Sequence, residues 1–481
     1  MSKMPLWNSD DAAIATGAAK KAEWCANGVS IDTRTLNKGD LFIALRGPKH
    51  DGHHYIAEAM AKGAAAVIAD RKTEKCSSNT PILYVADTLE ALRNLGKYAR
   101  RRTSANIIAV TGSAGKTGTK DALFHVLSSQ GKTTASIASY NNHFGVPLSL
   151  ARMHADDKFG IFEIGMNQKG EIASLTKMVL PHIVIITTIE AAHIEFFKNL
   201  EEIADAKAEI FQGLDRNGTA ILNMDNTQFT RLQKSANQQK IKNIISFGRK
   251  NTANAKIISS TISSEGSNIE AVICGQHIRY WLNLQGVHQI TNSLAVLATI
   301  HALNANLESA AKILGKIEAL PGRGKHHKLL LPSGTFTLID ESYNANPASM
   351  KAAIQVLGSI QIAFHGRRIA VLGDMKELGR ESKKFHADLS KYLVNNGIDR
   401  VYATGDEIKA MFDELPQKIQ GKFSSCVEIV LEHLLEELSR DDVVMVKGSF
   451  TSGMRHVVSV LRDKFSRSDQ KTRKQEGQYV I

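Results

Sequence analysis

The sequence of 481 residues is poor in cysteine and contains no long apolar run. Its four cysteines (Cys25, Cys76, Cys274 and Cys426) stand far apart without a C-x-x-C pair, which argues against a disulfide framework or a cysteine zinc site. No apolar stretch approaches the roughly 20 residues that span a bilayer, and residues 1–20 lack the order of a signal peptide. These absences predict a soluble, cytoplasmic protein.

The charge and the length of the chain indicate its class of partner and its number of domains. The formal net charge is +12, but lysine and arginine are spread along the chain and aromatic residues make up only 6%. Because such a surface is unlike one that stacks nucleic-acid bases, we expect small acidic substrates and no nucleic-acid partner. The length exceeds what one core usually serves and predicts about three domains. We expect the protein to be a monomer.

The stretch 107–120 joins an apolar run to a glycine-broken turn and then to an expected helix. The glycines would let backbone N–H groups approach an anion, the lysine would add positive charge, and the last threonine would offer Mg²⁺ a hydroxyl. The residues of this predicted phosphate loop are Gly112, Ser113, Ala114, Gly115, Lys116 and Thr117. Because Val110 stands where the common loop has a glycine, an ordinary glycine turn is the alternative.

Two polar residues downstream stand where a plain structural sheet would not need them. Strand-like runs at 160–164, 183–186, 219–222 and 244–247 alternate with helical stretches, which predicts a mostly parallel sheet with ligands at the strands' carboxyl ends. Glu163 is a natural Mg²⁺ ligand there, or else a surface carboxylate on an edge strand. His193 follows the second of these runs and is either a ligand or an ordinary loop histidine.

Lys207 lies on the apolar stripe of an expected helix over 200–214, four residues after Ile203. Burial disfavours the charged form of a lysine, and its neutral amine can act as a nucleophile or take up CO₂ to become a carbamate. The alternative is a side chain that snorkels to solvent.

The first hundred residues predict a small α/β domain. Strands are expected at 29–34, 40–46 and 65–68, and helices at 55–62 and 88–102. The polar loop 49–54 is the expected place for ligand contact. Its His53 and His54 are candidate metal ligands, although paired loop histidines without a third ligand are usually solvated.

The last third of the chain predicts a doubly wound domain. Residues 250–283 alternate as β-hairpins, a helix with Asn292 near its start follows, and 320–324 form a sharp break. Beyond it, strands are expected at 335–340, 368–372, 400–403 and 442–446, and helices at 349–357 and 383–395. The segments 373–375, 404–406 and 447–449 directly follow strands and should gather at one rim, facing a ligand.

We therefore predict an α/β protein of three domains. Residues 1–103 form a small N-terminal α/β domain, and 104–324 form a central P-loop mononucleotide-binding α/β domain with added hairpins. Residues 325–481 form a C-terminal, Rossmann-like domain, whose charged tail from about 467 we expect to be mobile.

Taken together, these motifs resemble the Mur ligases, the ATP-dependent amide-forming enzymes of peptidoglycan precursor synthesis, over nearly the whole chain. The family-wide marks are Thr111-Gly-Ser-Ala-Gly-Lys-Thr117, Asp32-Thr-Arg34, Gly39-Asp-Leu-Phe-Ile-Ala-Leu45, Ala206-Lys-Ala-Glu-Ile210 and Gly286-Val-His288. The marks of one member are Asp340-Glu-Ser-Tyr-Asn-Ala-Asn-Pro347, Gly373-Asp-Met-Lys-Glu-Leu-Gly379 and Asn141-Asn-His-Phe-Gly-Val-Pro147. Departures are Gln289, Thr33 and Phe450, where asparagine, serine and a basic residue are frequent.

The resemblance implies a set of site residues. Lys116 would contact the ATP phosphates, Thr117 and Glu163 would hold one Mg²⁺, His193 would help hold a second, and Lys207 matches the family's carbamylated lysine. The remaining ATP contacts would be Asn292, Arg323, Asp340, Tyr343 and Asn344. The UDP-sugar would meet Thr33, Arg34, Arg46, Gly47, Asp51, His53, Asn141 and Asn142.

The resemblance also implies the reaction and its partners. D-alanyl-D-alanine would be joined to UDP-N-acetylmuramoyl-tripeptide through an acyl phosphate, giving ADP and phosphate, with the acceptor dipeptide on the C-terminal domain. Closure of that domain, with hinges near Thr103 and Arg323, would shield the acyl phosphate from water. Three alternatives stay open: the Mur ligase that adds the third residue, whose Asp-Asn-Pro-Arg signature is absent here, a folylpolyglutamate synthetase, and a nucleotide-binding regulator.

Overall fold

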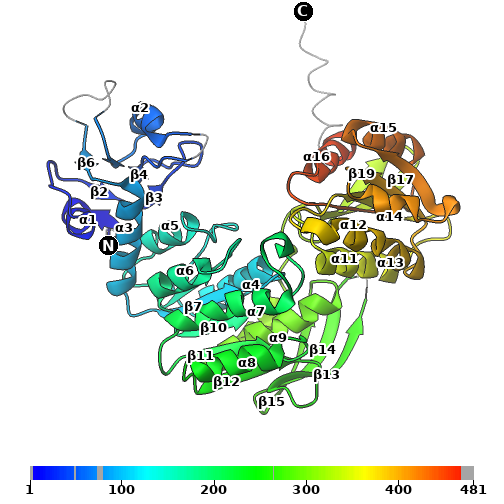
Figure 1. Ribbon diagram of the computed structural model, residues 1–481, viewed down its shortest axis with the longest axis horizontal. Coiled ribbons are helices and arrows are strands. Elements are labelled where there is room, and N and C mark those ends of the chain that lie inside the picture. The colour runs from blue at the N-terminus through cyan, green and yellow to red at the C-terminus, as the bar shows by residue number, and fades with distance from the viewer. Residues whose placement is uncertain (1–3, 48–49, 73–79, 264, 467–481) are drawn as a thin grey trace, which may run out of the picture.

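In the part of the chain that the structure describes, three large β-sheets each belong to their own α/β unit, and the first unit also holds a two-stranded sheet (Figure 1). The structure is a computed structural model that describes residues 4–47, 50–72, 80–263 and 265–466. Cys76, residues 48–49 of the N-terminal loop and the tail from 467 lie outside the described residues. The expected three-domain α/β architecture is confirmed, whereas the domain boundaries stay predictions.

The N-terminal unit contains a parallel sheet in the order β3-β4-β5-β6 and a small antiparallel pair, β1 and β2. Its elements are β1 (Trp7–Asn8), α1 (Ser9–Thr16), β2 (Cys25–Ala26), β3 (Gly28–Ser30), β4 (Asp40–Ile43), α2 (Ile56–Ala61), β5 (Ala66–Ala69), β6 (Ile82–Tyr84) and α3 (Thr88–Arg101). The strand expected over 29–34 is observed as the shorter β3, because the Asp32 carboxylate accepts a hydrogen bond from the Arg34 N–H at 2.9 Å and turns the chain.

The central unit contains a sheet in the order β15-β14-β13-β12-β11-β10-β7-β9-β8, parallel from β8 to β13 and antiparallel beyond, so the added hairpins are confirmed. Its strands are β7 (Asn106–Thr111), β8 (Thr133–Ala135), β9 (Phe159–Glu163), β10 (Ile183–Ile186), β11 (Thr219–Asn223), β12 (Asn243–Gly248), β13 (Ala255–Ile262), β14 (Ser267–Ile273) and β15 (Gln276–Leu282). Its helices are α4 (Lys116–Ser128), α5 (Gly145–Ala151), α6 (Glu171–Val179), α7 (Leu200–Ala208), α8 (Phe229–Gln238), α9 (Val287–Ala302) and α10 (Leu307–Leu314).

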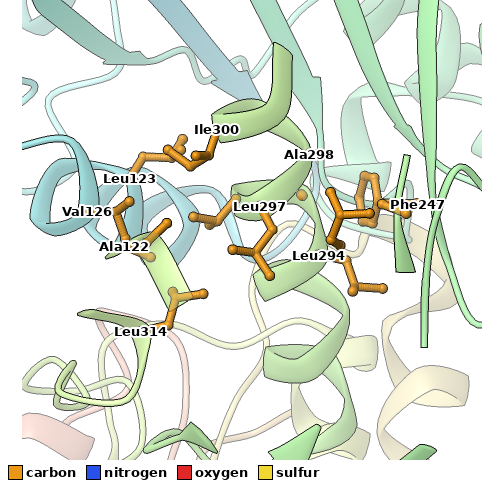
Figure 2. Packing of buried hydrophobic residues seen from close by; sticks show 14 of the residues in the cluster. Ala122, Leu123, Val126, Phe247, Leu294, Leu297, Ala298, Ile300 and Leu314 are labelled. Atoms are coloured by element: carbon orange, nitrogen blue, oxygen red, sulfur yellow. The ribbon is translucent and has the colours of Figure 1, made fainter. Parts of the chain in front are cut away.

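Helices cover both faces of the central sheet, which explains its almost wholly apolar inner strands. On one face, α4, α9 and α10 meet in a buried cluster that includes Leu123, Leu297 and Leu314 (Figure 2). On the other face, α6, α7 and α8 contribute residues such as Ile172, Ile203 and Leu232 to a second cluster. The sheet and its two packed faces thus fix where the loops at its carboxyl edge stand.

The expected helix 200–214 is wrong in its second half. Helix α7 ends at Ala208, and a 3₁₀ helix, η3 (Glu209–Gly213), follows. The Glu209 carboxylate accepts the N–H groups of Gly170 and Ala173 at the start of α6, at 2.7 and 3.1 Å. A Cβ at Gly213 would lie 2.2 Å from the Thr176 carbonyl oxygen, so the tight approach to α6 reshapes this turn.

The C-terminal unit contains a sheet in the order β16-β17-β21-β18-β19-β20, parallel except for the β16–β17 hairpin. Its elements are β16 (Lys325–Leu331), β17 (Gly334–Glu341), α11 (Pro347–Ser359), β18 (Arg368–Gly373), α12 (Ser382–Ala387), α13 (Leu389–Asn395), β19 (Arg400–Thr404), α14 (Lys409–Asp413), β20 (Gln420–Ser424), α15 (Val427–Glu437), β21 (Val443–Lys447) and α16 (Met454–Phe465). The sequence prediction missed β16 and β20 and treated α12 and α13 as one helix.

The expected gathering of post-strand segments at one rim is confirmed. The Ser449 N–H donates to the Asp374 carbonyl oxygen at 2.9 Å, and the Asp374 carboxylate accepts the Ile408 N–H at 2.9 Å. Because the Asp374 side chain is buried in these contacts, it ties the rim together.

Helix α5 ties the N-terminal unit to the central one. Gly96 of α3 lies against it, since an added Cβ would stand 3.0 Å from the Pro147 carbonyl oxygen. The Trp7 indole donates to the Ala151 carbonyl oxygen at 2.8 Å, and Arg152 donates to the Val29 carbonyl oxygen at 2.7 Å. Among the described residues, none of the helices has the length and apolar character needed to cross a membrane.

Candidate active site

A cavity of about 1220 Å³ opens at the carboxyl edge of the central sheet, and residues of the C-terminal unit line its other side. Most residues of the predicted ATP and metal site line it: Ser113, Ala114, Gly115, Lys116, Thr117, Glu163, His193, Lys207, Asn292, Arg323, Tyr343 and Asn344. Two of the predicted UDP-sugar residues, Asn141 and Asn142, line it as well. The fold therefore brings together residues that stand more than 200 positions apart in the sequence.

The two glycines of the phosphate loop are required by close packing. A Cβ at Gly112 would lie 1.9 Å from the Thr187 hydroxyl, and one at Gly115 would lie 2.7 Å from the Asn292 amide. Both glycines also have positive φ, at 147° and 83°, where other residues are strained. Gly112 itself does not line the cavity, and its carbonyl oxygen accepts a hydrogen bond from the Lys116 ammonium at 2.7 Å. Burial lowers the pKa of Lys116, while the charge of Glu163 opposes this shift and that of the nearby Arg323 adds to it.

Glu163 is buried and held on both carboxylate oxygens. The Thr117 hydroxyl donates to Oε2 at 2.8 Å, and the Asn141 amide donates to Oε1 at 2.7 Å. Because β9 lies between β7 and β8, the alternative of a surface carboxylate on an edge strand is wrong. Thr117 and Glu163 therefore present adjacent hard oxygen atoms beside the phosphate loop, a donor set that suits Mg²⁺.

Lys207 is also buried, with an exposed fraction of 2%, so the snorkelling alternative is wrong. It lines the cavity, and no ion pair or hydrogen bond reaches its amine from any residue that the structure describes. Burial lowers the pKa of Lys207 well below its ordinary value, and the positive charge of Lys116 lowers it further. Burial thus favours the neutral form of this amine, which lines the cavity.

His193 lies at the junction with the C-terminal unit. Its Nδ1 forms an ion pair with Oε2 of Glu377, whose pKa is lowered chiefly by this contact. Its backbone is left-handed, with φ at 59°, directly before the 3₁₀ helix η2 (Ile194–Phe196). Glu377 stands in the segment 373–379 that carries one of the sequence marks, but sequence reasoning did not single it out.

The C-terminal unit adds aromatic and basic groups to the cavity. The Arg323 guanidinium lies over the Tyr343 ring at 4.0 Å and donates to the Ser139 hydroxyl at 3.3 Å. Asp340, by contrast, does not line the cavity: its carboxylate accepts the Gly322 N–H at 2.8 Å and the Ser342 hydroxyl at 2.5 Å. In this structure Asp340 therefore supports the turn that positions Arg323, and its nucleotide contact stays a prediction.

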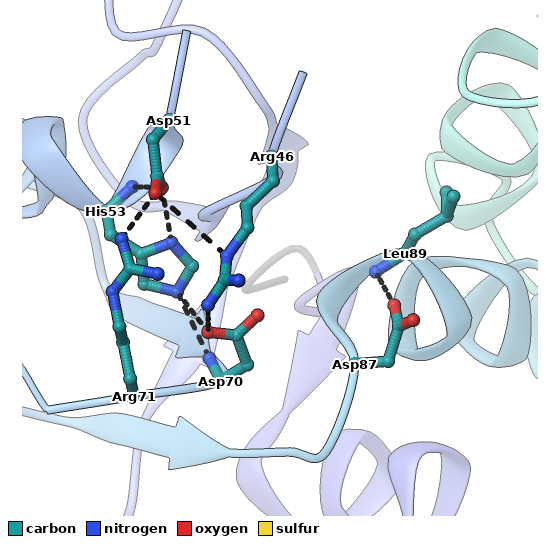
Figure 3. Close-up of polar contacts among 7 residues, drawn as sticks. All are labelled: Arg46, Asp51, His53, Asp70, Arg71, Asp87 and Leu89. Carbon is teal, nitrogen blue, oxygen red and sulfur yellow. Dashed lines mark hydrogen bonds and ion pairs between the residues drawn. The ribbon is translucent and has the colours of Figure 1, made fainter. Parts of the chain in front are cut away.

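The predicted UDP-sugar residues of the N-terminal unit lie outside this cavity. His53 is not a solvated loop histidine, since it is buried between Asp51 and Asp70 (Figure 3). Its Nδ1 lies 2.7 Å from the Asp51 carboxylate, and its Nε2 accepts the Asp70 N–H at 3.2 Å. Arg46 reaches the Asp70 carboxylate at 2.8 Å, and Arg71 pairs with Asp51.

The other residues of that prediction surround the same loop. Arg34 is exposed and pairs with Asp32 at 2.6 Å, and the Thr33 carbonyl oxygen accepts the Lys62 ammonium at 2.8 Å. The Gly47 N–H donates to the His50 carbonyl oxygen at 2.8 Å. Among the described residues, no three His, Cys, Asp or Glu side chains gather as a metal cluster, so the metal alternative for His53 and His54 has no third ligand there.

Sequence reasoning also missed residues that hold the phosphate loop. The Ser113 hydroxyl donates to the Glu190 carbonyl oxygen at 2.9 Å, and the Asn346 amide of the C-terminal unit reaches the Ser113 carbonyl oxygen at 3.4 Å. The Thr187 hydroxyl donates to the Ala114 carbonyl oxygen at 2.5 Å. The one signal that could have indicated these residues is their position in the chain: Thr187 and Glu190 follow β10, and Asn346 precedes α11.

Comparison with known proteins assigns each unit to one family. The Mur ligase family catalytic domain matches residues 26–100, the Mur ligase middle domain matches 110–300, and the Mur ligase glutamate ligase domain matches 330–450. The chain is similar to the UDP-N-acetylmuramoyl-tripeptide--D-alanyl-D-alanine ligase of Rickettsia prowazekii, with 36% identity covering 92% of this chain and 97% of that one. The Escherichia coli ligase of the same name is 33% identical, covering 94% and 97%.

Solved structures of the same family are similar to this chain over most of its length. The crystal structure of MurF from Acinetobacter baumannii superposes with a TM-score of 0.82 at 28% identity, covering 95% of this chain and 99% of that one. MurF from Thermotoga maritima in complex with ADP gives 0.75 at 25% identity, covering 91% and 97%. Because a Mur ligase family model matches each of the three units and the two ligases are similar to the chain over more than nine-tenths of its length, the chain belongs to the Mur ligase family.

Proposed function

We propose that this Mur ligase joins D-alanyl-D-alanine to UDP-N-acetylmuramoyl-tripeptide at the expense of ATP. The observation that carries the proposal is the similarity over almost the full length of relatives that bear this activity in their name, together with a cavity that unites the predicted ATP site. Mur ligases use ATP, and the similar Thermotoga maritima structure holds ADP. ATP is a cytoplasmic nucleotide, and the cytoplasm is where we place the reaction.

The phosphate loop is the proposed ATP site. It leads into α4, and the N–H groups at the start of a helix, with the partial positive charge of its dipole, favour a phosphate. Lys116 would exchange its Gly112 carbonyl partner for phosphate oxygens. Asn292, packed against Gly115, and the Arg323–Tyr343 pair would hold the rest of the nucleotide.

Magnesium fits the oxygen donors of this site. Thr117 and Glu163 would hold one Mg²⁺, and His193, with Lys207 as a carbamate, would support a second. When bound, Mg²⁺ neutralises the charge that develops on the transferring phosphoryl group. The carbamate forms when the neutral Lys207 amine bonds to the carbon of CO₂ and releases a proton. It would give this buried group a negative charge beside the Lys116 cation.

The remaining chemistry follows from the substrates. The terminal carboxylate of the tripeptide attacks the γ-phosphorus of ATP, ADP leaves, and an acyl phosphate remains. The amine of D-alanyl-D-alanine then attacks the acyl carbon, the bond to phosphate breaks, and the amine gives up a proton. Lys116 would stabilise the charge of the first transfer, and the C-terminal unit would close over the cavity and exclude water.

The N-terminal unit would hold the UDP-sugar. Helix α5, which follows Asn141 and Asn142 closely, joins that unit to the cavity, and we expect one extended substrate to reach from the loop around His53 to Glu163.

Phosphate release from ATP tests the proposal. We expect release with UDP-N-acetylmuramoyl-tripeptide only when D-alanyl-D-alanine is present, and we expect Lys116→Ala to abolish it. The exposed Lys177 provides a matched control, since Lys177→Ala should keep the rate. The assignment would be contradicted if phosphate release were equally fast without D-alanyl-D-alanine, or if it required a single amino acid in place of the dipeptide. Scattering profiles that stayed unchanged on adding nucleotide and sugar substrate together would remove the support for closure.

A further inference from the structure

A short segment of the central unit, residues 193–195, meets a turn of the C-terminal unit, residues 377–379. The Glu195 N–H donates to the Glu377 carbonyl oxygen at 3.1 Å, and a Cβ at Gly379 would lie 3.2 Å from the Glu195 Cα. Between them, Ile194 packs against the buried clusters of both units. The junction is therefore a built contact with backbone, apolar and charged parts.

The charged part joins His193 to Glu377. Both residues are left-handed, with φ at 59° and 63°, a conformation that costs a non-glycine residue of the order of 1 kcal/mol or more. Such strain persists only where surrounding contacts impose it. The contacts of this junction thus hold two strained residues in positions where their side chains meet.

The geometry leaves one ring nitrogen of His193 available. Nδ1 forms the ion pair with Glu377, Nε2 has no hydrogen bond or ion pair within the described part of the chain, and His193 lines the same cavity as Glu163 and Lys207. A histidine that binds a metal through one nitrogen usually pairs its other nitrogen with a carboxylate, which fixes the ring and strengthens the ligand. Here that carboxylate comes from a different unit of the chain.

We propose that Glu377 is a positioning residue that orients His193 toward the second Mg²⁺, so that metal affinity depends on where the C-terminal unit sits. This inference rests on the proposed function, since it needs the metal site of that proposal. It makes the contact between the two units a sensor of where the C-terminal unit sits: moving that unit away withdraws the carboxylate and leaves His193 free to turn. Metal binding and domain position then favour each other by the same factor.

Direct metal binding tests the proposal without turnover. Mn²⁺ serves as the probe, and free Mn²⁺ is measured by electron paramagnetic resonance with a non-hydrolysable ATP analogue present. We expect Glu377→Ala to weaken the second Mn²⁺ site about 10-fold, the lower end of the range for losing such a partner. Glu377→Gln keeps an acceptor oxygen without the charge and should give an intermediate loss. Glu381, which is exposed two residues beyond the turn at 377–379 and pairs with Lys384, supplies the control Glu381→Ala, with no change.

Two further variants separate the possible outcomes. In His193→Ala, adding Glu377→Ala should cause no further loss of Mn²⁺ affinity, because Glu377 acts through the histidine. Equal Mn²⁺ binding by Glu377→Ala and the unchanged protein, with His193→Ala impaired, would overturn the inference and leave Glu377 as a plain contact between units. Glu163→Ala tests the site itself: if it left Mn²⁺ binding unchanged, the proposed metal site would fail instead. Thermal unfolding of each variant confirms that it is folded.

Discussion

Two buried titratable side chains, Lys207 in the central cavity and His53 in the N-terminal unit, have opposite surroundings. They are 2% and 3% exposed, respectively. His53 is held on both ring nitrogens by Asp51 and Asp70, with Arg46 and Arg71 completing the network. Lys207 has no such partner among the described residues, and its neighbouring charge is another cation, Lys116.

The difference separates structural support from chemistry. A buried polar group that is fully paired stabilises one arrangement of the chain, as the His53 network does for its loop. A buried amine without a partner costs stability, and it persists where another task requires it. Lys207 therefore points to modification or catalysis, and His53 points to the shape of a binding loop.

Replacing Lys207 should give the largest effect and tests one side of this comparison. We expect Lys207→Met to lower the rate of phosphate release about 1000-fold, the size of losing a group that stabilises the transition state. Its unfolding temperature should stay equal or rise, because methionine fills the space without an amine that must be desolvated. The rate of phosphate release and the unfolding temperature, measured on the same preparation, check both expected effects.

The carbamate itself has two separate readouts. Lys207→Ala should recover part of its activity when short carboxylic acids are added, since they can replace the missing charge. With ¹³C-labelled bicarbonate, the unchanged protein should give a carbamate resonance that Lys207→Met lacks. A fully active alanine variant would show that the lysine has no part in the reaction.

Replacing His53 should have a smaller and different effect. His53→Ala leaves Asp51 and Asp70 without their shared partner and should lower the free energy of unfolding by about 2 kcal/mol. The KM for the UDP-sugar should rise several-fold with kcat little changed, because only the binding loop loses its support. Denaturant unfolding and steady-state kinetics measure the two effects.

The neighbouring His54 is exposed and serves as the matched control. His54→Ala should change the free energy of unfolding by no more than about 0.5 kcal/mol. If both histidine variants behaved alike, the network in Figure 3 would not explain the role of His53.

The smallest expected effect concerns the pH dependence of stability. Burial raises the pKa of Asp51, but hydrogen bonds from the His53 backbone and side chain and from Arg71 outweigh it and hold the pKa below the ordinary value of 3.8. This carboxylate therefore stabilises the native state above that value, and its contribution is lost as the pH falls below it. The free energy of unfolding should fall less steeply with acidification in Asp51→Asn. Asp10→Asn, at an exposed ion pair with Lys20, should keep the slope of the unchanged protein.

Much of the fold could be predicted because its signals are local. The strands over 183–186 and 244–247 are mostly apolar runs covered on both faces, and the hairpins after 250 alternate polar and apolar residues. Each of these patterns can be recognised within a few residues of the sequence. The missed elements depend on distant partners. The second half of the expected helix 200–214 changes form because Glu209 caps α6, more than 30 residues earlier in the chain.

The chemical groups of the site could be recognised along the chain: a glycine-broken loop with Lys116 and Thr117, a carboxylate at the end of a strand, and a lysine on an apolar stripe. The folded chain alone shows which of them share a cavity, that Asp340 supports a turn, and that Glu377 reaches His193 from another unit. Residue type and spacing follow from short-range patterns along the chain. Burial, pairing and the resulting pKa depend on segments that the fold brings together from far apart, and no local pattern carries that information.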